Sequence, residues 1–224
     1  MKICYVFASR LRPGRFFEAI NNIRSMSATD NYFILAKLDS DDYTMNCERA
    51  ISELAKYPEL QVKWGSSNGK IHAINRDNEE AETVDIIICM SDDMRFTVYG
   101  FDNIIRSHMP ETLDAFLHYP ESYAEERVCT MSIMGVNYYR RFGYIYNPAY
   151  YSLWCDNEAT EVAKLLGKYH FINQELFEHQ HYSNAKAKKD NLYKRNDTYR
   201  ADERIFNYRK ENNFDLPVKQ LHEA

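Results

Sequence analysis

The chain has 224 residues and a formal net charge of −5, and 45% of its residues are hydrophobic. This length suits one sizeable α/β core with an extension, and the composition excludes wholesale disorder. The negative balance gives the chain no general attraction to nucleic acid or to anionic membranes.

The sequence also bears on localisation. It contains no apolar run near the roughly 20 residues that span a bilayer, and its N-terminus lacks the apolar core of a signal peptide. The five cysteines are odd in number and show no paired zinc spacing, which favours reduced, buried thiols. We therefore expect a cytoplasmic protein with no transmembrane segment and no nucleic-acid partner.

The first half of the sequence alternates strand-like and helical patterns. Short apolar runs predict strands at residues 2–8, 32–38, 60–64 and 86–90. Apolar residues at helical spacing predict helices at residues 16–26 and 43–56, and a further one beginning near Ile71. This alternation indicates an α/β fold with a mostly parallel central sheet, right-handed crossovers and flanking helices.

Beyond Phe101 the pattern is looser. The sequence predicts helices at residues 101–108 and 156–166, and strands at residues 128–134, 143–148 and 169–172. From Ala185 onward the chain is charged and rich in tyrosine, with helical spacing in residues 203–210. We therefore divide the chain into a main domain, residues 1–182, and a helical C-terminal extension, residues 183–224, packed on or near the functional site.

Acidic clusters follow two of the predicted strands. Asp92 and Asp93 come after the fourth strand, and Asp39 and Asp41 come after the second. Ligands of open α/β sheets bind at the carboxyl ends of the strands. Adjacent carboxylates repel each other unless a cation lies beside them, and Mg²⁺ or Mn²⁺ suits such oxygen ligands. A solvated turn is the alternative for the first pair taken alone.

A basic loop follows the first strand. Residues 9–15 contain three arginines and a single glycine. Arginine forks suit the recognition of phosphate or carboxylate, although a basic loop can also be merely solvated. Carboxylates for a metal and arginines for phosphates together suggest a site for a nucleotide or a nucleotide sugar.

Several motifs in this order resemble those of the family 2-type glycosyltransferases, which have the GT-A fold of the nucleotide-diphospho-sugar transferase superfamily. The resemblance covers the main domain. Its closest single match is Asn68-Gly69-Lys70-Ile71-His72-Ala73-Ile74-Asn75, which is similar to the family's Gly-Lys-x-x-Ala-x-Asn signature.

The resemblance implies a donor-binding role for three of the motifs. The first nucleotide-binding loop would contain Ser9, Arg10 and Arg12, and the carboxylates that contact the nucleobase or ribose would be Asp39 and Asp41. The signature segment would serve the diphosphate through Asn68, Gly69, Lys70 and Asn75. In that segment glycine permits close backbone approach, the amides that open the next helix would face an anion, and lysine adds a positive charge. Uridine is the favoured nucleobase.

The resemblance also implies a divalent metal, Mn²⁺ or Mg²⁺. Ser91-Asp92-Asp93 occupies the place of the metal-binding Asp-x-Asp motif, with serine where the family often has its first aspartate. We therefore predict Asp93 as a direct ligand and Asp92 as a partner of the ribose or of the direct ligands. Either His179 or His181 would be the late histidine ligand, and a pair of surface-loop histidines is the alternative.

Trp154-Cys155-Asp156-Asn157-Glu158 resembles the segment that carries the catalytic base. Asp156 would accept the proton of an acceptor hydroxyl, with Glu158 in reserve. The alternative is that Asp156 caps the helix that follows it, and the two roles are compatible.

The reaction implied is transfer of a sugar from a nucleotide diphosphate to an unidentified hydroxyl, with inversion at the anomeric carbon. Two alternatives stay open. A nucleotidyltransferase of related topology would usually open with a glycine-rich phosphate loop, unlike residues 9–15. A nucleotide- or sugar-binding module would have kept the fold and lost catalysis, which the serine at position 91 leaves possible. The sequence makes no prediction of oligomeric state.

Overall fold

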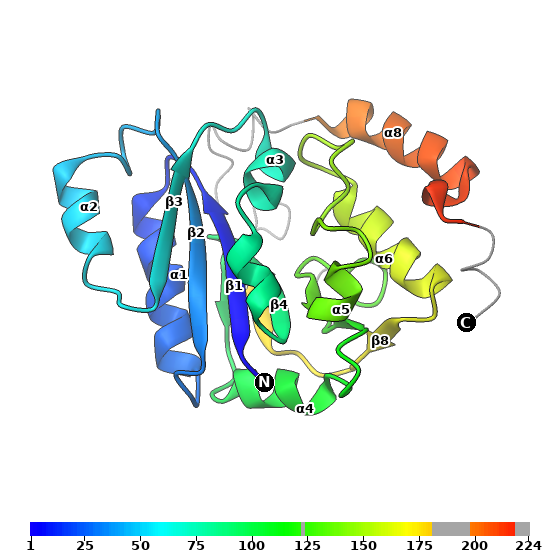
Figure 1. Ribbon diagram of the computed structural model, residues 1–224, viewed down its shortest axis with the longest axis horizontal. Coiled ribbons are helices and arrows are strands. Elements are labelled where there is room, and N and C mark those ends of the chain that lie inside the picture. The colour runs from blue at the N-terminus through cyan, green and yellow to red at the C-terminus, as the bar shows by residue number, and fades with distance from the viewer. Residues whose placement is uncertain (122–123, 181–197, 218–224) are drawn as a thin grey trace.

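The computed structural model describes residues 1–121, 124–180 and 198–217 (Figure 1). Its core is a seven-stranded sheet with the strand order β3-β2-β1-β4-β7-β6-β8. Four of the six strand pairs are parallel, and the two pairs made by β7 are antiparallel. The strands are β1 Ile3–Ser9, β2 Tyr32–Asp39, β3 Leu60–Gly65, β4 Ile86–Met90, β6 Phe116–His118, β7 Ile133–Gly135 and β8 Tyr169–Phe171. The mostly parallel α/β sheet expected from the sequence is confirmed.

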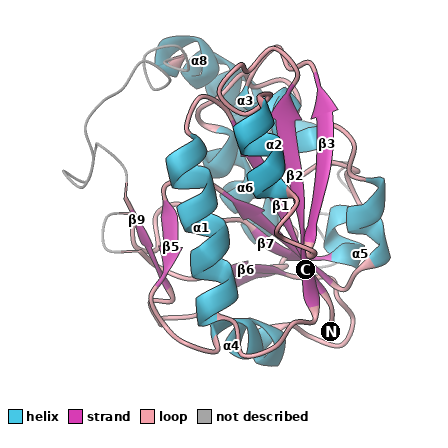
Figure 2. Ribbon diagram, turned by 90° about the vertical axis from the view of Figure 1, so that its left-hand side faces the viewer, coloured by secondary structure: helices cyan, strands magenta, loops and turns pink. Residues whose placement is uncertain are grey.

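Alternate side chains of β1 enter two separate hydrophobic cores, one on each face of the sheet. Ile3, Tyr5 and Phe7 join the first core, and Cys4 and Val6 join the second. All five are fully buried, which explains why this strand is apolar along its whole length. The helices therefore cover both faces of the sheet, as Figure 2 shows for α1 (Pro13–Met26) and α5 (Val136–Tyr139).

Helix α1 shows why the local sequence folds as it does. Pro13 is its first residue, a position where the missing amide hydrogen costs nothing and the fixed φ suits the helix. Phe16, Ala19, Ile20 and Ile23 recur at helical spacing and are fully buried in the first core. The first core also receives α4 (Phe101–His108), whereas α3 (Lys70–Asn75) contributes to the second.

Two predicted elements differ from the structure because polar side chains take the backbone amides. The helix predicted at residues 43–56 is only α2 (Glu48–Leu54), since the Asp42 carboxylate accepts from the backbone N–H of Thr44 at 3.0 Å and holds the preceding residues in turns. The strand predicted at residues 143–148 does not form. There the Asn75 side chain accepts from the backbone N–H of Ile145 at 3.1 Å.

The second half of the sheet is built from shorter strands than expected. The apolar run at residues 128–134 forms a strand only in β7, where β4 and β6 lie on either side of it. The strand β6 was not predicted. Nor was the separate two-stranded sheet that joins β5 (Met94–Phe96) to β9 (Phe177–His179), which Figure 2 shows apart from the main sheet.

The C-terminal part contains α6 (Cys155–Leu165) and α8 (Tyr199–Glu211), followed by the short 3-10 helix η3 (Asn213–Asp215). Another 3-10 helix, η1 (Glu79–Thr83), precedes β4. Helix α8 lies against α6, and the rings of Trp154 and Phe206 are 5.1 Å apart (Figure 1). Thus α8 is the helix expected in the C-terminal extension, whereas the boundary proposed at residue 182 lies outside the described residues. Within the described ranges, no helix is both long and apolar enough to cross a bilayer.

Candidate functional site

The carboxyl ends of three neighbouring parallel strands, β2, β1 and β4, bring the first loop and the two acidic clusters together. Ser9 Oγ donates to Asp92 Oδ2 at 3.0 Å, and Arg12 Nη1 lies 3.0 Å from Asp92 Oδ1. Asp92 is buried, and burial raises its pKa together with the charge of Asp93, while Arg12 opposes that rise. Both oxygens of Asp92 thus have protein partners, and its role as a partner of the ribose or of the direct ligands stays a prediction.

Arg10 joins the first loop to the second acidic cluster. Its Nη1 donates to Asp39 Oδ2 at 2.8 Å, and the guanidinium also binds both carboxylate oxygens of Asp41, with Nη1 2.5 Å from Oδ1 and Nη2 2.8 Å from Oδ2. Arg10 thus recognises carboxylates here. The other oxygen of Asp39 is buried and has no hydrogen-bond partner among the described residues. It is an acceptor suited to a hydroxyl group of a ligand.

A neighbouring acidic residue was missed as a candidate. Asp42 is fully buried, and its Oδ2 accepts from the backbone N–H of Leu11 at 2.7 Å. This contact fixes the first loop against the end of β2. The sequence signal was present, because Asp42 continues the cluster that contains Asp39 and Asp41.

Asp93 lies beside His179, and both are residues for which the sequence predicts metal binding. Ser91 Oγ donates to Asp93 Oδ1 at 2.6 Å, and His179 Nε2 is 3.6 Å from the same oxygen. The pairing of β5 with β9 sets this arrangement, since Met94 is opposite His179 and the backbone N–H of Gln180 donates to the Asp93 carbonyl at 2.6 Å. Burial opposes ionisation of Asp93, but His179, Ser91 and Lys70 hold its pKa well below the usual range. His181 lies outside the described residues.

The donor chemistry of this pair fits a divalent cation of the Mn²⁺ or Mg²⁺ kind. Carboxylate oxygen suits both ions, and imidazole also binds transition metals. The described residues contain no group of three or more His, Cys, Asp or Glu side chains that could hold an ion by themselves. Water or a bound diphosphate could complete the coordination of an ion at Asp93 and His179, which is how Mg²⁺ is commonly held.

The signature segment opens α3, but two of its predicted features need correction. A Cβ atom at Gly69 would lie 2.9 Å from two ring carbons of Tyr151, so the close approach that glycine permits is made by this tyrosine. The backbone N–H of Ile71 donates to the Tyr151 carbonyl at 3.1 Å and does not face an anion. Asn68 and Lys70 are exposed at the start of the helix.

Asn75 also differs from its predicted role. Its Nδ2 donates to the Tyr146 carbonyl at 2.6 Å, and its Oδ1 accepts from the backbone N–H groups of Ile145 and Tyr146 at 3.1 and 3.3 Å. The side chain is therefore occupied in fixing residues 145–146 against α3, and we no longer assign it to the ligand.

Lys70 connects the two predicted catalytic regions electrostatically. Desolvation opposes its protonated form, but the neighbouring groups Cys155, Asp93 and Asp156 outweigh this and raise the pKa of Lys70. The charges of the predicted metal ligand and of the predicted base thus both act on this ammonium group. It suits the neutralisation of a diphosphate.

Asp156 is the second residue of α6 and does not cap it. The residue before the helix is Trp154, and no side chain makes a capping hydrogen bond there. Asp156 is half-buried, and its Oδ1 accepts from the backbone N–H of Asn157 at 3.0 Å. The capping alternative is thus wrong, and a carboxylate in the first turn of the helix remains for proton chemistry.

Glu158, the reserve candidate, has a structural role. Arg209 on α8 binds it in a bidentate manner, with Nε 2.7 Å from Oε2 and Nη2 2.9 Å from Oε1, and the Tyr150 hydroxyl donates to Oε2 at 2.7 Å. Both oxygens are occupied, and the side chain is buried. Glu158 therefore ties α6 to α8, and we withdraw it as a catalytic candidate.

Comparisons of the sequence give no assignment: no protein-family model matches the chain, and no curated protein matches it. Comparisons of the structure find proteins of similar fold. The mannosyltransferase PcManGT from Pyrobaculum calidifontis, in complex with GDP-Man and Mn²⁺, superimposes with a TM-score of 0.61 at 13% identity, over 77% of this chain. The 1–349 fragment of S. aureus TarS, in complex with UDP-GlcNAc, superimposes with a TM-score of 0.62 at 12% identity, over 80% of this chain.

These similarities establish the fold. The central sheet and its flanking helices are of the GT-A-like kind, as the sequence predicted. The chain spans 54% of the PcManGT structure and 58% of the TarS fragment.

Proposed function

We propose that the chain is a metal-dependent glycosyltransferase that moves a sugar from a nucleoside-diphosphate donor to a hydroxyl acceptor. The observation that supports this most is the meeting of Asp39, Asp92 and the arginines of the first loop at the carboxyl ends of neighbouring strands of a GT-A-like sheet, with Asp93 beside His179. Two similar structures hold GDP-Man with Mn²⁺ and UDP-GlcNAc. Ligands of open α/β sheets bind at these ends of the strands.

In this proposal the donor is bound by the ends of β1, β2 and β4. The buried oxygen of Asp39 that has no partner in the described part of the chain would accept a hydroxyl of the ribose. Asp93 and His179 would hold Mn²⁺ or Mg²⁺, which as a Lewis acid would neutralise charge on the departing diphosphate. Lys70 would add its positive charge to the same group. Uridine diphosphate is the favoured carrier, on resemblance alone.

Asp156 would be the general base. Its carboxylate would accept the proton of the acceptor hydroxyl as the oxygen forms a bond to the anomeric carbon, and the bond from that carbon to the diphosphate would break with its electron pair. One base and direct displacement give inversion. The assignment is supported by the occupation of Glu158, the nearest other candidate, by Arg209.

Donor binding can be tested by thermal unfolding in a panel of nucleoside diphosphates with and without Mn²⁺. A ligand present at about 100 times its Kd stabilises the folded state by about 2.7 kcal/mol, which for a chain of this size raises Tm by roughly 5–10 °C. We expect UDP or GDP with Mn²⁺ to give such a shift. Absence of any shift at millimolar concentration, for every nucleotide and with Mn²⁺ present, would show that the donor site is wrongly assigned.

Turnover can be tested by hydrolysis of nucleotide sugars, with and without Mn²⁺. We expect release of nucleoside diphosphate from at least one donor, and we expect it to depend on the metal. The second candidate function, a catalytically inactive binding module, is favoured by the Ser91 hydroxyl, which donates to Asp93 where the family often has a carboxylate. A nucleotide-dependent thermal shift without turnover, over a broad panel of donors and acceptors, would favour the module.

A further inference from the structure

A buried carboxylate on α8 binds three consecutive backbone amides of a loop near the site. Asp202 is 1% exposed. Its Oδ1 accepts from the N–H of Tyr151 at 3.1 Å, and its Oδ2 accepts from those of Ser152 and Leu153 at 3.0 and 2.8 Å. The Thr198 hydroxyl, at the start of α8, also donates to Oδ2. This one side chain therefore fixes the backbone of residues 151–153, which we call the bridging loop.

The bridging loop holds the start of α3 at one of its ends. The Tyr151 carbonyl accepts from the N–H of Ile71 at 3.1 Å, and the Tyr151 ring fills the space beside Gly69. Lys70 lies between these two contacts in the sequence. The position of Lys70 thus depends on the position of Tyr151.

At its other end the bridging loop leads directly into α6. Trp154 has a φ of 63°, in the left-handed region that a residue with a bulky side chain adopts only at a cost. The helix begins at the next residue, and Asp156 is the second residue of that helix. A strained turn persists only where the surrounding structure fixes it. The three amides that Asp202 binds immediately precede the strained residue, Trp154.

We propose that Asp202 is a positioning residue, through which α8 fixes Lys70 and Asp156 relative to each other. The proposal has a catalytic part and a structural part. Its catalytic part rests on the proposed function, in which Lys70 would act on the diphosphate and Asp156 on the acceptor. Its structural part, the coupling of α8 to both α3 and α6 through the bridging loop, stands on the contacts alone.

Helix α8 has other attachments to α6, so Asp202 can be changed without detaching it. Arg209 binds Glu158, and the Phe206 ring packs 5.1 Å from that of Trp154. Neutralising Asp202 alone should therefore loosen the bridging loop while α8 stays in place. This makes Asp202→Asn the informative variant.

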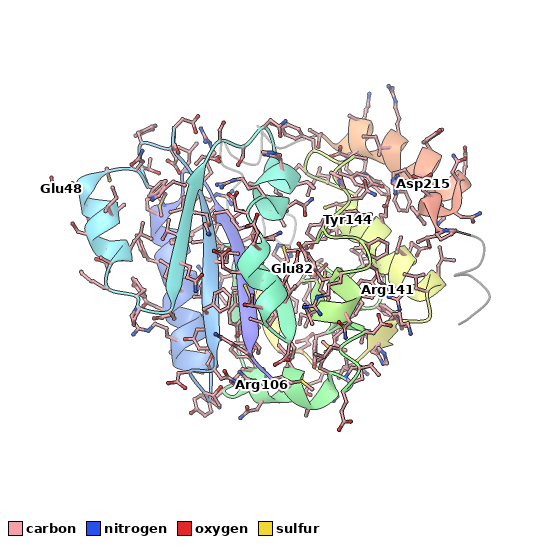
Figure 3. All side chains as sticks on the ribbon, viewed as in Figure 1. Glu48, Glu82, Arg106, Arg141, Tyr144 and Asp215 are labelled. Carbon is pink, nitrogen blue, oxygen red and sulfur yellow. The ribbon has the colours of Figure 1, made fainter. Side chains whose placement is uncertain are left out.

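A matched control exists on α4. Asp102 is also fully buried, accepts from the backbone N–H of Ala28 at 2.8 Å and from the hydroxyl of Thr29 at 2.9 Å, and binds Arg106. Figure 3 shows Arg106 at the lower edge of the molecule and Asp215, just beyond α8, at the upper right. Asp102→Asn thus removes a similar buried charge far from the bridging loop.

Hydrogen exchange tests the structural part without any substrate. In Asp202→Asn we expect the amides of residues 151–153 to exchange at least about 10-fold faster, and we expect the increase to extend to Ile71 and to the first turn of α6. In Asp102→Asn these amides should exchange as in the wild type. An increase confined to residues 151–153 in Asp202→Asn would overturn the coupling.

Kinetics test the catalytic part, with donor hydrolysis as the assay. Misplacement of a reacting group by about 1 Å can cost roughly 100-fold in rate, so we expect kcat of Asp202→Asn to fall about 10- to 100-fold. The affinity for nucleoside diphosphate with Mn²⁺ should fall by less than kcat does, because, of the groups proposed to bind the diphosphate, only Lys70 depends on the bridging loop, and the strand ends are untouched. Equal losses of kcat in Asp202→Asn and Asp102→Asn, at a temperature where both are folded, would overturn the positioning role.

If Asp202→Asn does not fold, Thr198→Val removes one hydroxyl from the same carboxylate and should give the same exchange pattern at smaller amplitude. A wild type that binds nucleoside diphosphate but hydrolyses no donor would refute the proposed transferase and, with it, the catalytic part of this inference. The exchange experiment would still decide the coupling.

Discussion

The two halves of the central sheet place their candidate residues in different ways. The strands β3, β2, β1 and β4 have five to eight residues each and pair only in parallel with one another. The strands β7, β6 and β8 have three residues each and include both antiparallel pairs. The first half places its candidates directly at strand ends. In the second half, Asp156 does not lie at the end of a strand but in the first turn of α6.

Asp156 is placed instead by contacts from distant parts of the chain. The bridging loop before it is bound by Asp202, 49 to 51 positions later in the sequence, and Glu158 on the same helix is bound by Arg209, 51 positions later. The comparison leads us to propose that donor binding and turnover depend on separable parts of the fold. Changes in the first half should abolish binding, whereas changes in the second should spare binding and affect rate or stability.

The largest effect should follow from Asp156→Asn. Asparagine keeps the shape of the side chain but loses the proton affinity of a carboxylate, so turnover should fall by about 10²–10⁴-fold, the contribution of a general base. Nucleoside diphosphate binding with Mn²⁺ should persist, as measured by thermal shift. Glu158→Gln is the control on the same helix and should keep most of its turnover. Full activity in Asp156→Asn would move the base to another carboxylate and would remove the distinction between the halves.

The next effect concerns the metal. Asp93→Ala should abolish Mn²⁺-dependent nucleotide binding, because it removes the oxygen that we propose as a direct ligand of the ion. Asp92→Ala should weaken binding less, by about 10- to 100-fold, because Asp92 acts through Ser9 and Arg12. Titration of Mn²⁺ against each variant in the presence of nucleoside diphosphate measures both. Equal and small effects would place the ion elsewhere, at Asp39 and Asp41, or nowhere on this edge.

The sequence predicted the first half well because its signals are local. The strands β1, β2 and β4 are largely apolar runs, and each has acidic or basic candidates at its carboxyl end, so the positions of Ser9, Asp39 and Asp93 follow from topology. His179 could be predicted only by resemblance. Its actual neighbour, Asp93, is brought to it by a pairing of three-residue strands that no periodicity reveals.

Three errors share one physical cause, which is that groups assigned to other roles are bound by residues distant in the sequence. Asn75 binds the amides of residues 145–146, which the sequence predicted as part of a strand. Tyr151 takes the amide of Ile71 that was expected to face an anion, and Arg209 takes the carboxylate of Glu158. Such contacts connect residues far apart in sequence, and nothing in the local pattern marks them.

Glu158→Gln should lower stability more than it lowers activity. The variant neutralises the bidentate partner of the half-buried Arg209, which then keeps the exposed carboxylate of Asp215 as its charged partner, and loss of a charged hydrogen-bond partner costs about 1–3 kcal/mol. For a chain of this size that corresponds to a fall in Tm of roughly 2–12 °C. Lys56→Gln is the control, since Lys56 and Glu53 form a pair on the surface of the first half. A Tm for Glu158→Gln within about 1 °C of the wild type would show that this pair does not secure the second half.

The smallest effect is a pH dependence confined to the second half. His118 on β6 is buried, and burial, together with the charge of Lys164, lowers its pKa to about 4 from a usual value of 6.5, while a backbone contact at Glu125 opposes the shift. Its Nδ1 lies 2.7 Å from the Tyr169 hydroxyl on β8. Between these two pKa values the unfolded chain binds a proton that the folded chain does not, so stability should fall as pH falls from about 6.5 toward 4.

His118→Asn, which retains a hydrogen-bonding group, should flatten this part of the plot of Tm against pH, whatever its effect at neutral pH. His170→Asn, a change at an exposed histidine nearby, is the control. If the slope between pH 6.5 and pH 4 is the same in His118→Asn and in the wild type, the acid sensitivity belongs to other groups and not to the short strands of the second half.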